Sequence, residues 1–176
     1  PDYSSAASDV YKRQGIWSKE LMRKLGLNIP LEAERGYHVV YKNASILPRN
    51  PMMMTIGKFG VTPMGGDLRC AGTVELGGIN FGPSKAPIRL LRRRVAEAFP
   101  KMTYDETEEW LGFRPTAPDS LPLIGQLKES GVYTAFGHQH IGMTSGPKTG
   151  RLISDIINNR SPNIDMSVYD PNRFNL

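Results

Sequence analysis

The chain has 176 residues, of which 39% are hydrophobic and 22% charged, a composition typical of a soluble globular domain. No run of 18 apolar residues occurs, so the sequence predicts no transmembrane helix. The single cysteine, Cys70, excludes an internal disulfide, and with only three dispersed histidines it excludes a cysteine–histidine zinc site. We therefore expect no metal site, although a histidine–carboxylate site stays open. The net charge of +5 favours anionic partners only weakly.

Residues 1–14 differ from the rest of the chain. They are polar and aperiodic, and they lack the apolar centre of a signal peptide. The stretch SAASDVYKRQ resembles a translated sequencing adapter. We therefore expect residues 1–14 to be non-native, with the natural protein starting at Gly15 and its upstream part missing.

A short helix is predicted first, from Ser18 as its cap to Gly26 as its left-handed end. Its apolar stripe is Leu21, Met22 and Leu25. From 35 to 78 the pattern becomes that of a mixed, mostly antiparallel sheet of about four strands, with a hairpin turn at 65–67. Met52–Met54 and Cys70 are expected in the core of this region, Cys70 as a small apolar residue.

Residues 84–99 have helical periodicity. The predicted buried positions are Ile88, Leu91, Val95 and Phe99. The basic run 92–94 is interpreted as a solvated face of this helix. The alternative is a surface that binds nucleic acid or acidic lipid.

The last third of the chain predicts a strand at 107–113 with Arg114 at its end, and a buried strand at 132–136. A glycine-bearing loop then leads to a helix with Pro147 in its first turn. The buried face of that helix is predicted as Leu152, Ile153, Ile156 and Ile157. The tail, 161–176, is polar and is expected to run over the surface.

Two features of this region could carry chemistry. A glycine-bearing loop before a helix presents free amides to an anion or an electron-rich carbonyl, although the glycines could simply allow tight turns. Their spacing is not the G-x-G-x-x-G of dinucleotide sites. Arg114 could clamp a carboxylate or be an ordinary surface arginine, and His138 could face a ligand or be a polar loop residue.

Six short motifs, in order, resemble the C-terminal portion of the FAD-dependent D-amino-acid oxidase and dehydrogenase family over residues 15–176, most closely its D-amino-acid dehydrogenase branch. They are Gly15-Ile16-Trp17-Ser18; Arg35-Gly36-Tyr37; Gly72-Thr73-Val74-Glu75-Leu76; Gly112-Phe113-Arg114-Pro115 with Pro118-Asp119; Pro122-Leu123-Ile124-Gly125; and Gly137-His138, followed by Gly142-Met143-Thr144 and 146–151.

The resemblance implies the C-terminal part of a two-domain flavoprotein of α+β and α/β character. Residues 15–34 and 112–160 would belong to a Rossmann-like FAD domain, and 35–111 to a substrate domain built on a mixed, mostly antiparallel sheet. It implies that Arg114 grips the substrate carboxylate, with Tyr37 and His138 as further pocket residues. Cofactor-binding residues would be Trp17, Ser18, Gly142, Met143 and Thr144.

The implied reaction is hydride transfer from the α-carbon of a D-amino acid to flavin N5, giving an imine that hydrolyses to a keto acid and ammonia. Because the cofactor carries this chemistry, we name no catalytic base. No cysteine follows the Arg114 motif, so non-covalent FAD is expected. The family's upstream G-x-G-x-x-G is absent, so we expect this chain alone to be inactive.

The expected partners are a small amino-acid substrate and an electron acceptor, which could be a quinone, a carrier protein or oxygen. We expect no nucleic acid as a partner, and a cytoplasmic location with peripheral contact to the inner membrane as an option.

One alternative function is that of an amine oxidase similar to glycine or sarcosine oxidase. The other is a non-catalytic binding module that uses the basic helix.

Overall fold

The computed structural model describes residues 15–128 and 130–174, so the expectation for residues 1–14 lies outside the described part. The elements in chain order are η1 (Gly15–Trp17), α1 (Ser18–Lys24), β1 (Glu32–Tyr41), β2 (Met52–Met54), β3 (Phe59–Met64), β4 (Asp67–Leu76), α2 (Lys85–Ala98), β5 (Thr107–Thr116), β6 (Leu123–Gln126), β7 (Tyr133–Phe136), α3 (Gly142–Ile157), η2 (Ser167–Tyr169) and η3 (Pro171–Phe174).

Five strands form one sheet in the order β2-β3-β4-β1-β5. Four of them lie in the predicted β region, and the turn between β3 and β4 uses Gly65 and Gly66 at positive φ, which confirms the hairpin. Every strand pair among the described residues is antiparallel, so the antiparallel character is confirmed and no parallel pair is found there. β1 and β5 pair along their full length, from Glu32 opposite Thr116 to Tyr41 opposite Thr107.

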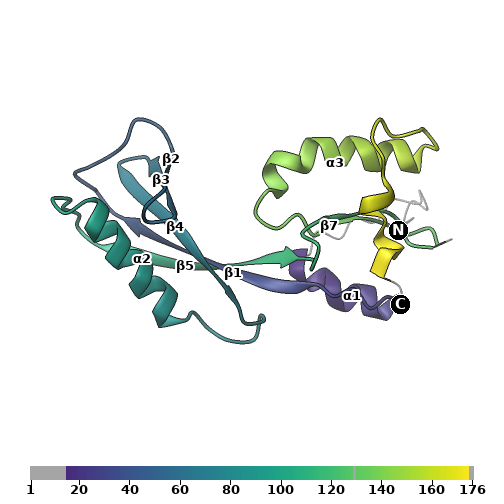
Figure 1. Cartoon of the computed structure of the whole chain (residues 1–176), viewed down its shortest axis with the longest axis horizontal. Coiled ribbons are helices and arrows are strands. Elements are labelled where there is room, and N and C mark those ends of the chain that lie inside the picture. The colour runs from purple at the N-terminus through teal and green to yellow at the C-terminus, as the bar shows by residue number, and fades with distance from the viewer. Residues whose placement is uncertain (1–14, 129, 175–176) are drawn as a thin grey trace, which may run out of the picture.

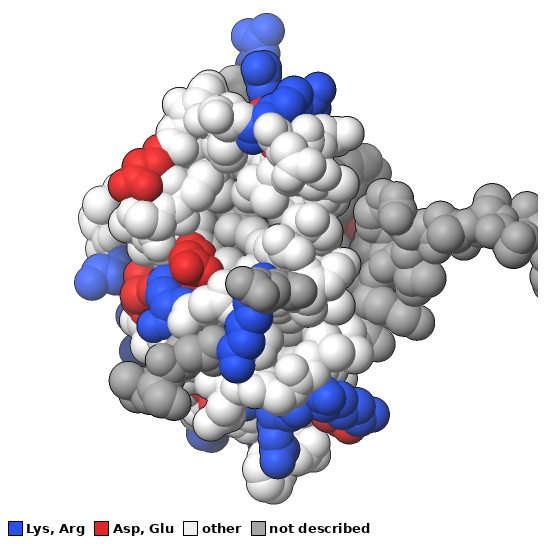
Figure 2. Space-filling view, turned by 90° about the vertical axis from the view of Figure 1, so that its right-hand side faces the viewer, with Lys and Arg blue, Asp and Glu red and all other residues white. Residues whose placement is uncertain are grey.

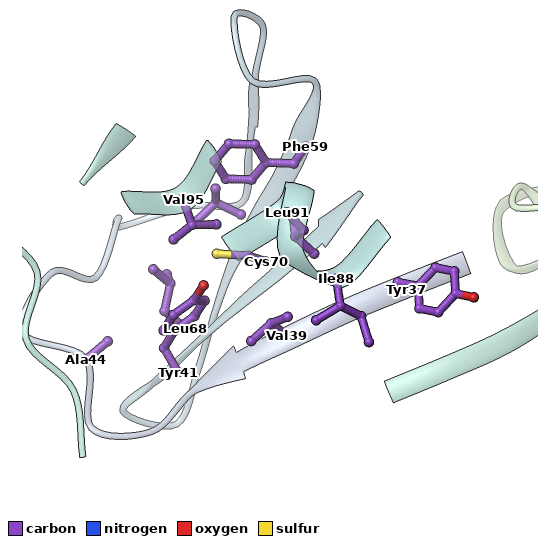
Figure 3. Close-up of a cluster of buried hydrophobic side chains, with 11 residues drawn as sticks. Tyr37, Val39, Tyr41, Ala44, Phe59, Leu68, Cys70, Ile88, Leu91 and Val95 are labelled. Atoms are coloured by element: carbon purple, nitrogen blue, oxygen red, sulfur yellow. The ribbon is translucent and has the colours of Figure 1, made fainter. Parts of the chain in front are cut away.

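Helix α2 covers one face of this sheet and closes the first apolar core (Figures 1 and 3). This α2 core consists of Tyr37, Val39, Tyr41, Ala44, Phe59, Val61, Leu68, Cys70, Ile88, Leu91 and Val95. The predicted positions Ile88, Leu91 and Val95 are therefore confirmed, whereas Phe99 follows the end of α2 and packs against this core only partly buried. Burial also raises the pKa of the Cys70 thiol to about 12, as expected for an inert apolar residue.

The prediction of a buried Met52–Met54 run is wrong. These residues form the short edge strand β2, where Met52 and Met53 are 46% and 70% exposed. An edge strand has only one neighbouring strand, and of these three residues only Met54 packs, partly buried, against the α2 core. The apolar composition of Met52–Met54 was therefore not sufficient to predict that these residues are buried.

A second apolar core lies at the other end of β1 and β5, among α1, the small sheet β6-β7 and the chain's last residues (Figure 1). This terminal core consists of Ile16, Met22, Leu27, Ile29, Leu31, Ala33, Ala117, Leu123 and Leu127. β1 and β5 thus run from one core to the other.

Five local predictions need correction. Ser18 is the buried first residue of α1, and its side chain makes no capping bond, because Trp17 occupies the cap position. Leu25, expected in the apolar stripe, is exposed. β5 continues through Arg114 to Thr116. α3 begins at Gly142, so Pro147 lies inside the helix and not in its first turn, and Ile157 at its end is exposed.

The tail is fastened to the protein and does not simply run over its surface. Arg173 donates from Nε and Nη2 to the two carboxylate oxygens of Asp119, at 2.8 and 3.2 Å. Pro171 is buried beside Gly125, and Phe174 packs against the terminal core. Within 15–128 and 130–174, no helix has both the length and the apolar character needed to cross a membrane.

Candidate functional site

Arg114 lies on the open face of the sheet, opposite the face that α2 covers. Successive strand residues alternate between faces, and Arg114 is the direct cross-strand partner of Glu34 in β1. Its Nη1 donates to Glu34 Oε1 at 3.2 Å. The arginine side chain is 31% exposed, so the guanidinium is both ion-paired and open to a ligand.

The loop before α3 is bonded to the end of the same strand. Gln139 donates its backbone N–H to the carbonyl of Pro115 at 3.2 Å, and His138 forms a β-bridge with Thr116. The loop is therefore held one and two residues beyond Arg114. These two contacts place the glycine-bearing loop beside the strand end that carries Arg114.

His138 fastens the loop to α3. Its Nε2 lies 2.9 Å from Oγ1 of the buried Thr149, so the ring is engaged with protein. Partial burial lowers the pKa of His138 below its usual value, which favours the neutral imidazole at pH 7. The geometry thus gives His138 a structural contact, and its role as a pocket residue stays a prediction.

The first turn of α3 is open. Gly142, Met143 and Thr144 supply its first amides, and Ile141 at the cap position offers no side-chain acceptor. Met143 is 97% exposed. Uncapped amides with the positive end of the helix dipole suit an anion or an electron-rich ring oxygen.

Trp17 reaches the same strand from η1. Its ring meets Phe113 edge-on, with centroids 6.2 Å apart, while about half of the side chain is exposed. Phe113 neighbours Arg114 in sequence but points to the other face of β5. The structure thus brings Trp17 and Ser18 near the strand that carries Arg114, although Ser18 is buried and presents no surface to a ligand.

Tyr37 is separated from Arg114. Its side chain belongs to the α2 core, where it is 1% exposed (Figure 3). Its hydroxyl donates to Glu75 Oε2 at 2.5 Å. The same hydroxyl accepts the backbone N–H of Ser84. Because odd-numbered residues of β1 point away from the face of Arg114, the geometry does not bring Tyr37 beside Arg114, and its role as a pocket residue stays a prediction.

Sequence reasoning missed the neighbours of Arg114 on the open face. Glu34 was not singled out, and Gly36 and Gly112 entered only as parts of motifs. The structure makes Gly36 and Gly112 direct cross-strand partners. Their pairing depends on a register between segments about 80 positions apart, for which local pattern carries no signal.

The basic helix does not present a free run of charge. Arg92 pairs with Glu109 at 2.8 Å and Arg93 with Glu97 at 3.7 Å. Figure 2 shows the opposite end of the molecule, where lysine and arginine side chains stand apart and interspersed with acidic ones. Within the described residues, no group of three or more histidine, cysteine, aspartate or glutamate side chains could hold a metal ion.

The chain is similar in sequence to several bacterial amino-acid oxidases and dehydrogenases. The chain is 37% identical over 165 residues to a D-amino-acid oxidase of Bradyrhizobium diazoefficiens, covering 91% of this chain and 39% of that protein. It is 31% identical over 160 residues to a glycine oxidase of Pseudomonas aeruginosa, with 89% and 43% covered. The chain therefore spans about two-fifths of the length of these relatives.

A similar fold occurs in the crystal structure of glycine oxidase from Geobacillus kaustophilus. The TM-score is 0.77 at 24% identity, over 92% of this chain and 44% of that one. The family described as FAD dependent oxidoreductase matches residues 14–156. This match shows that the chain belongs to the FAD-dependent oxidoreductase family that includes the D-amino-acid oxidases.

Proposed function

We propose that this chain forms the substrate-gripping part of an FAD-dependent enzyme that oxidises D-amino acids to imines, which hydrolyse to keto acids and ammonia. One observation carries the proposal: Arg114 offers donors on the open face of β5, and the loop leading to the open end of α3 is bonded to the same strand at Pro115 and Thr116. An amino-acid carboxylate and an electron-rich cofactor ring would then meet at one strand end.

The residues around α3 fit a flavin. The uncapped amides of Gly142–Thr144 could donate to a ring oxygen, and exposed Met143 and Trp17 offer apolar surface to a planar ring. Bound FAD would supply the two-electron acceptor for the substrate's α-carbon–hydrogen bond. Non-covalent binding is proposed because Cys70, the chain's one cysteine, is buried in the α2 core.

In this proposal Arg114 fixes the substrate by its carboxylate, using the donors that Glu34 does not occupy. Residues 15–34 and 112–160 would serve the FAD domain and 35–111 the substrate domain. The two apolar cores support this division. Ala33 and Phe113 pack with the terminal core, whereas Tyr37 and Leu111 pack with the α2 core.

The experiment uses the enzyme expressed with the upstream sequence of its gene, beside this chain alone. We expect the longer protein to be yellow and its flavin absorbance to be bleached under anaerobic conditions by D-alanine but not L-alanine. A colourless longer protein would refute the proposal. This chain alone, which contains no G-x-G-x-x-G sequence, is expected to be inactive.

The same assay tests the alternative of a glycine- or sarcosine-oxidising enzyme, which the similarity to glycine oxidase supports. Faster bleaching by glycine or sarcosine than by D-alanine would favour it. The electron acceptor, a quinone, a carrier protein or oxygen, follows from which of them reoxidises the bleached flavin. Peripheral membrane contact in an otherwise cytoplasmic enzyme is proposed only for a quinone acceptor.

A further inference from the structure

The guanidinium of Arg114 lies flat on the backbone of Gly36. A Cβ atom built at Gly36 would overlap Nη1, Cζ and Nη2 of the arginine together, so even an alanine would displace the group. Real Cβ atoms do not approach other atoms so closely. A side chain at Gly36 would therefore move the guanidinium from this place, and the effect arises from close approach, since the φ of Gly36 is not positive.

Glu34 holds one end of the same guanidinium. It lies two residues before Gly36 on the same face of β1, and its Oε1 accepts from Arg114 Nη1 at 3.2 Å. Its Oε2 accepts from Thr116 Oγ1 at 3.3 Å. The glutamate side chain is only 13% exposed, so both of its oxygens are directed at β5.

This arrangement leaves Arg114 with unused donors. Among residues 15–128 and 130–174, Glu34 is the single hydrogen-bond acceptor found for the Arg114 side chain. Nε and Nη2 therefore remain for a second anion, while the plane of the group is set by Gly36 below it and Glu34 at its end. A donor fork fixed before binding loses less entropy when it meets a carboxylate.

We propose that Glu34 and Gly36 are positioning residues for Arg114: Glu34 anchors the guanidinium at Nη1, and Gly36 provides the flat floor on which it rests. The inference rests on the proposed function, because it takes Arg114 as the group that binds the substrate carboxylate. The positioning role predicts that removing the charge of Glu34 weakens substrate binding. If Glu34 instead only repelled the incoming carboxylate, removing its charge would tighten substrate binding.

The experiment compares Glu34→Gln and Gly36→Ala in the flavoenzyme that contains this chain. KM and kcat are measured with D-alanine, and Kd with propionate, which has a carboxylate but no amine. We expect Glu34→Gln to raise KM and the propionate Kd about tenfold, with kcat changed less than about twofold. Gly36→Ala is also expected to raise both KM for D-alanine and Kd for propionate.

Two matched controls come from the same sheet. Glu32→Gln removes a negative charge from the same face of β1, at an exposed side chain that accepts the backbone N–H of Ala33. Gly60→Ala adds a methyl group in β3, where the nearest atom would be 3.7 Å away. Both controls are expected to leave KM and Kd unchanged.

A double variant separates the two proposals. If Glu34 acts through Arg114, adding Glu34→Gln to Arg114→Leu raises KM no further. An unchanged or lowered KM in Glu34→Gln, or full additivity in the double variant, would overturn the positioning role. An unchanged KM in Arg114→Leu would instead overturn the proposed function. Should Gly36→Ala fail to fold, Glu34→Gln and the double variant still decide.

Discussion

The indole of Trp110 lies over Gly112, the direct cross-strand partner of Gly36, so that a second flat group rests on the floor that carries the Arg114 guanidinium. His38 stacks on this indole, with ring centroids 4.8 Å apart and planes at 13°. The paired glycines thus let planar side chains lie along the open face of the sheet where ordinary residues would stand upright from it.

A side chain at Gly112 is therefore expected to displace the Trp110 ring, which is 52% exposed. Gly112→Ala would force the Trp110 ring out of its place, since a Cβ there would overlap the ring. Overpacking a closed core costs about 1–3 kcal/mol, and because this ring is half exposed we expect a loss of about 1 kcal/mol in the free energy of unfolding. Urea unfolding followed by tryptophan fluorescence measures it, with Gly60→Ala as the control. Equal stability of the two variants would contradict the close approach seen here.

Arg114→Leu is expected to raise KM for the amino acid by about 10–100-fold and to change kcat less, because a charge-assisted bond to the carboxylate is lost. Steady-state kinetics of the flavoenzyme measure the change. Arg92→Leu is the matched control, because it breaks an ion pair to the same strand β5 through Glu109. An effect of Arg92→Leu as large as that of Arg114→Leu would mean that the arginine acts only on stability.

Tyr37→Phe tests whether Tyr37 acts in the α2 core or in the substrate pocket. The variant loses the bond to Glu75 within a network where Glu75 also accepts from Ser84 Oγ at 2.8 Å and lies 3.5 Å from buried Arg35. We expect the melting temperature to fall by about 2–4 °C while KM stays unchanged. Differential scanning calorimetry and kinetics on the same preparation separate the two effects. A raised KM with unchanged melting temperature would restore the pocket role.

The same network predicts an acid dependence. The hydrogen bond from Tyr37, then that from Ser84, holds the pKa of Glu75 below its usual 4.5. A lowered carboxyl pKa contributes stability that is complete above about pH 4.5 and is lost as pH falls through the folded-state value. Glu75→Gln should therefore flatten the fall in melting temperature below about pH 4.5. A slope identical to that of the parent protein would argue against the network.

His138 gives a second pH dependence, in a higher range. Burial lowers its pKa below 6.5, so the unfolded chain binds a proton more readily than the folded one. Stability is then full above about pH 6.5 and decreases as pH falls towards the folded-state pKa. His138→Asn should remove this dependence. The melting temperature between pH 7.5 and 5 measures it, and a variant with an undiminished slope would contradict the burial of the ring.

The sequence alone was sufficient to predict the buried residues of an element when a single helical or strand periodicity determines its buried face. The stripe Ile88, Leu91 and Val95 faces the sheet, because helical spacing leaves one apolar side. The alternation of 37, 39 and 41 could also have placed Tyr37 inside, since it shares a face with Val39. Arg114 was identified from its motif, but its partner was not. The register that sets Glu34 opposite Arg114 arises from the whole sheet, and no neighbouring residue encodes it.

The continuous pairing of β1 with β5 has a mechanical consequence. The two cores are joined by ten successive cross-strand pairs, from Glu32–Thr116 to Tyr41–Thr107, and not by a flexible connection. Rotation of one core against the other would have to twist or shear the β1–β5 pairing, and all of its backbone hydrogen bonds oppose such a distortion. Motion between the halves is therefore expected as a small change in strand twist, and the stiffness of the Arg114 site is set by the backbone on which it is built.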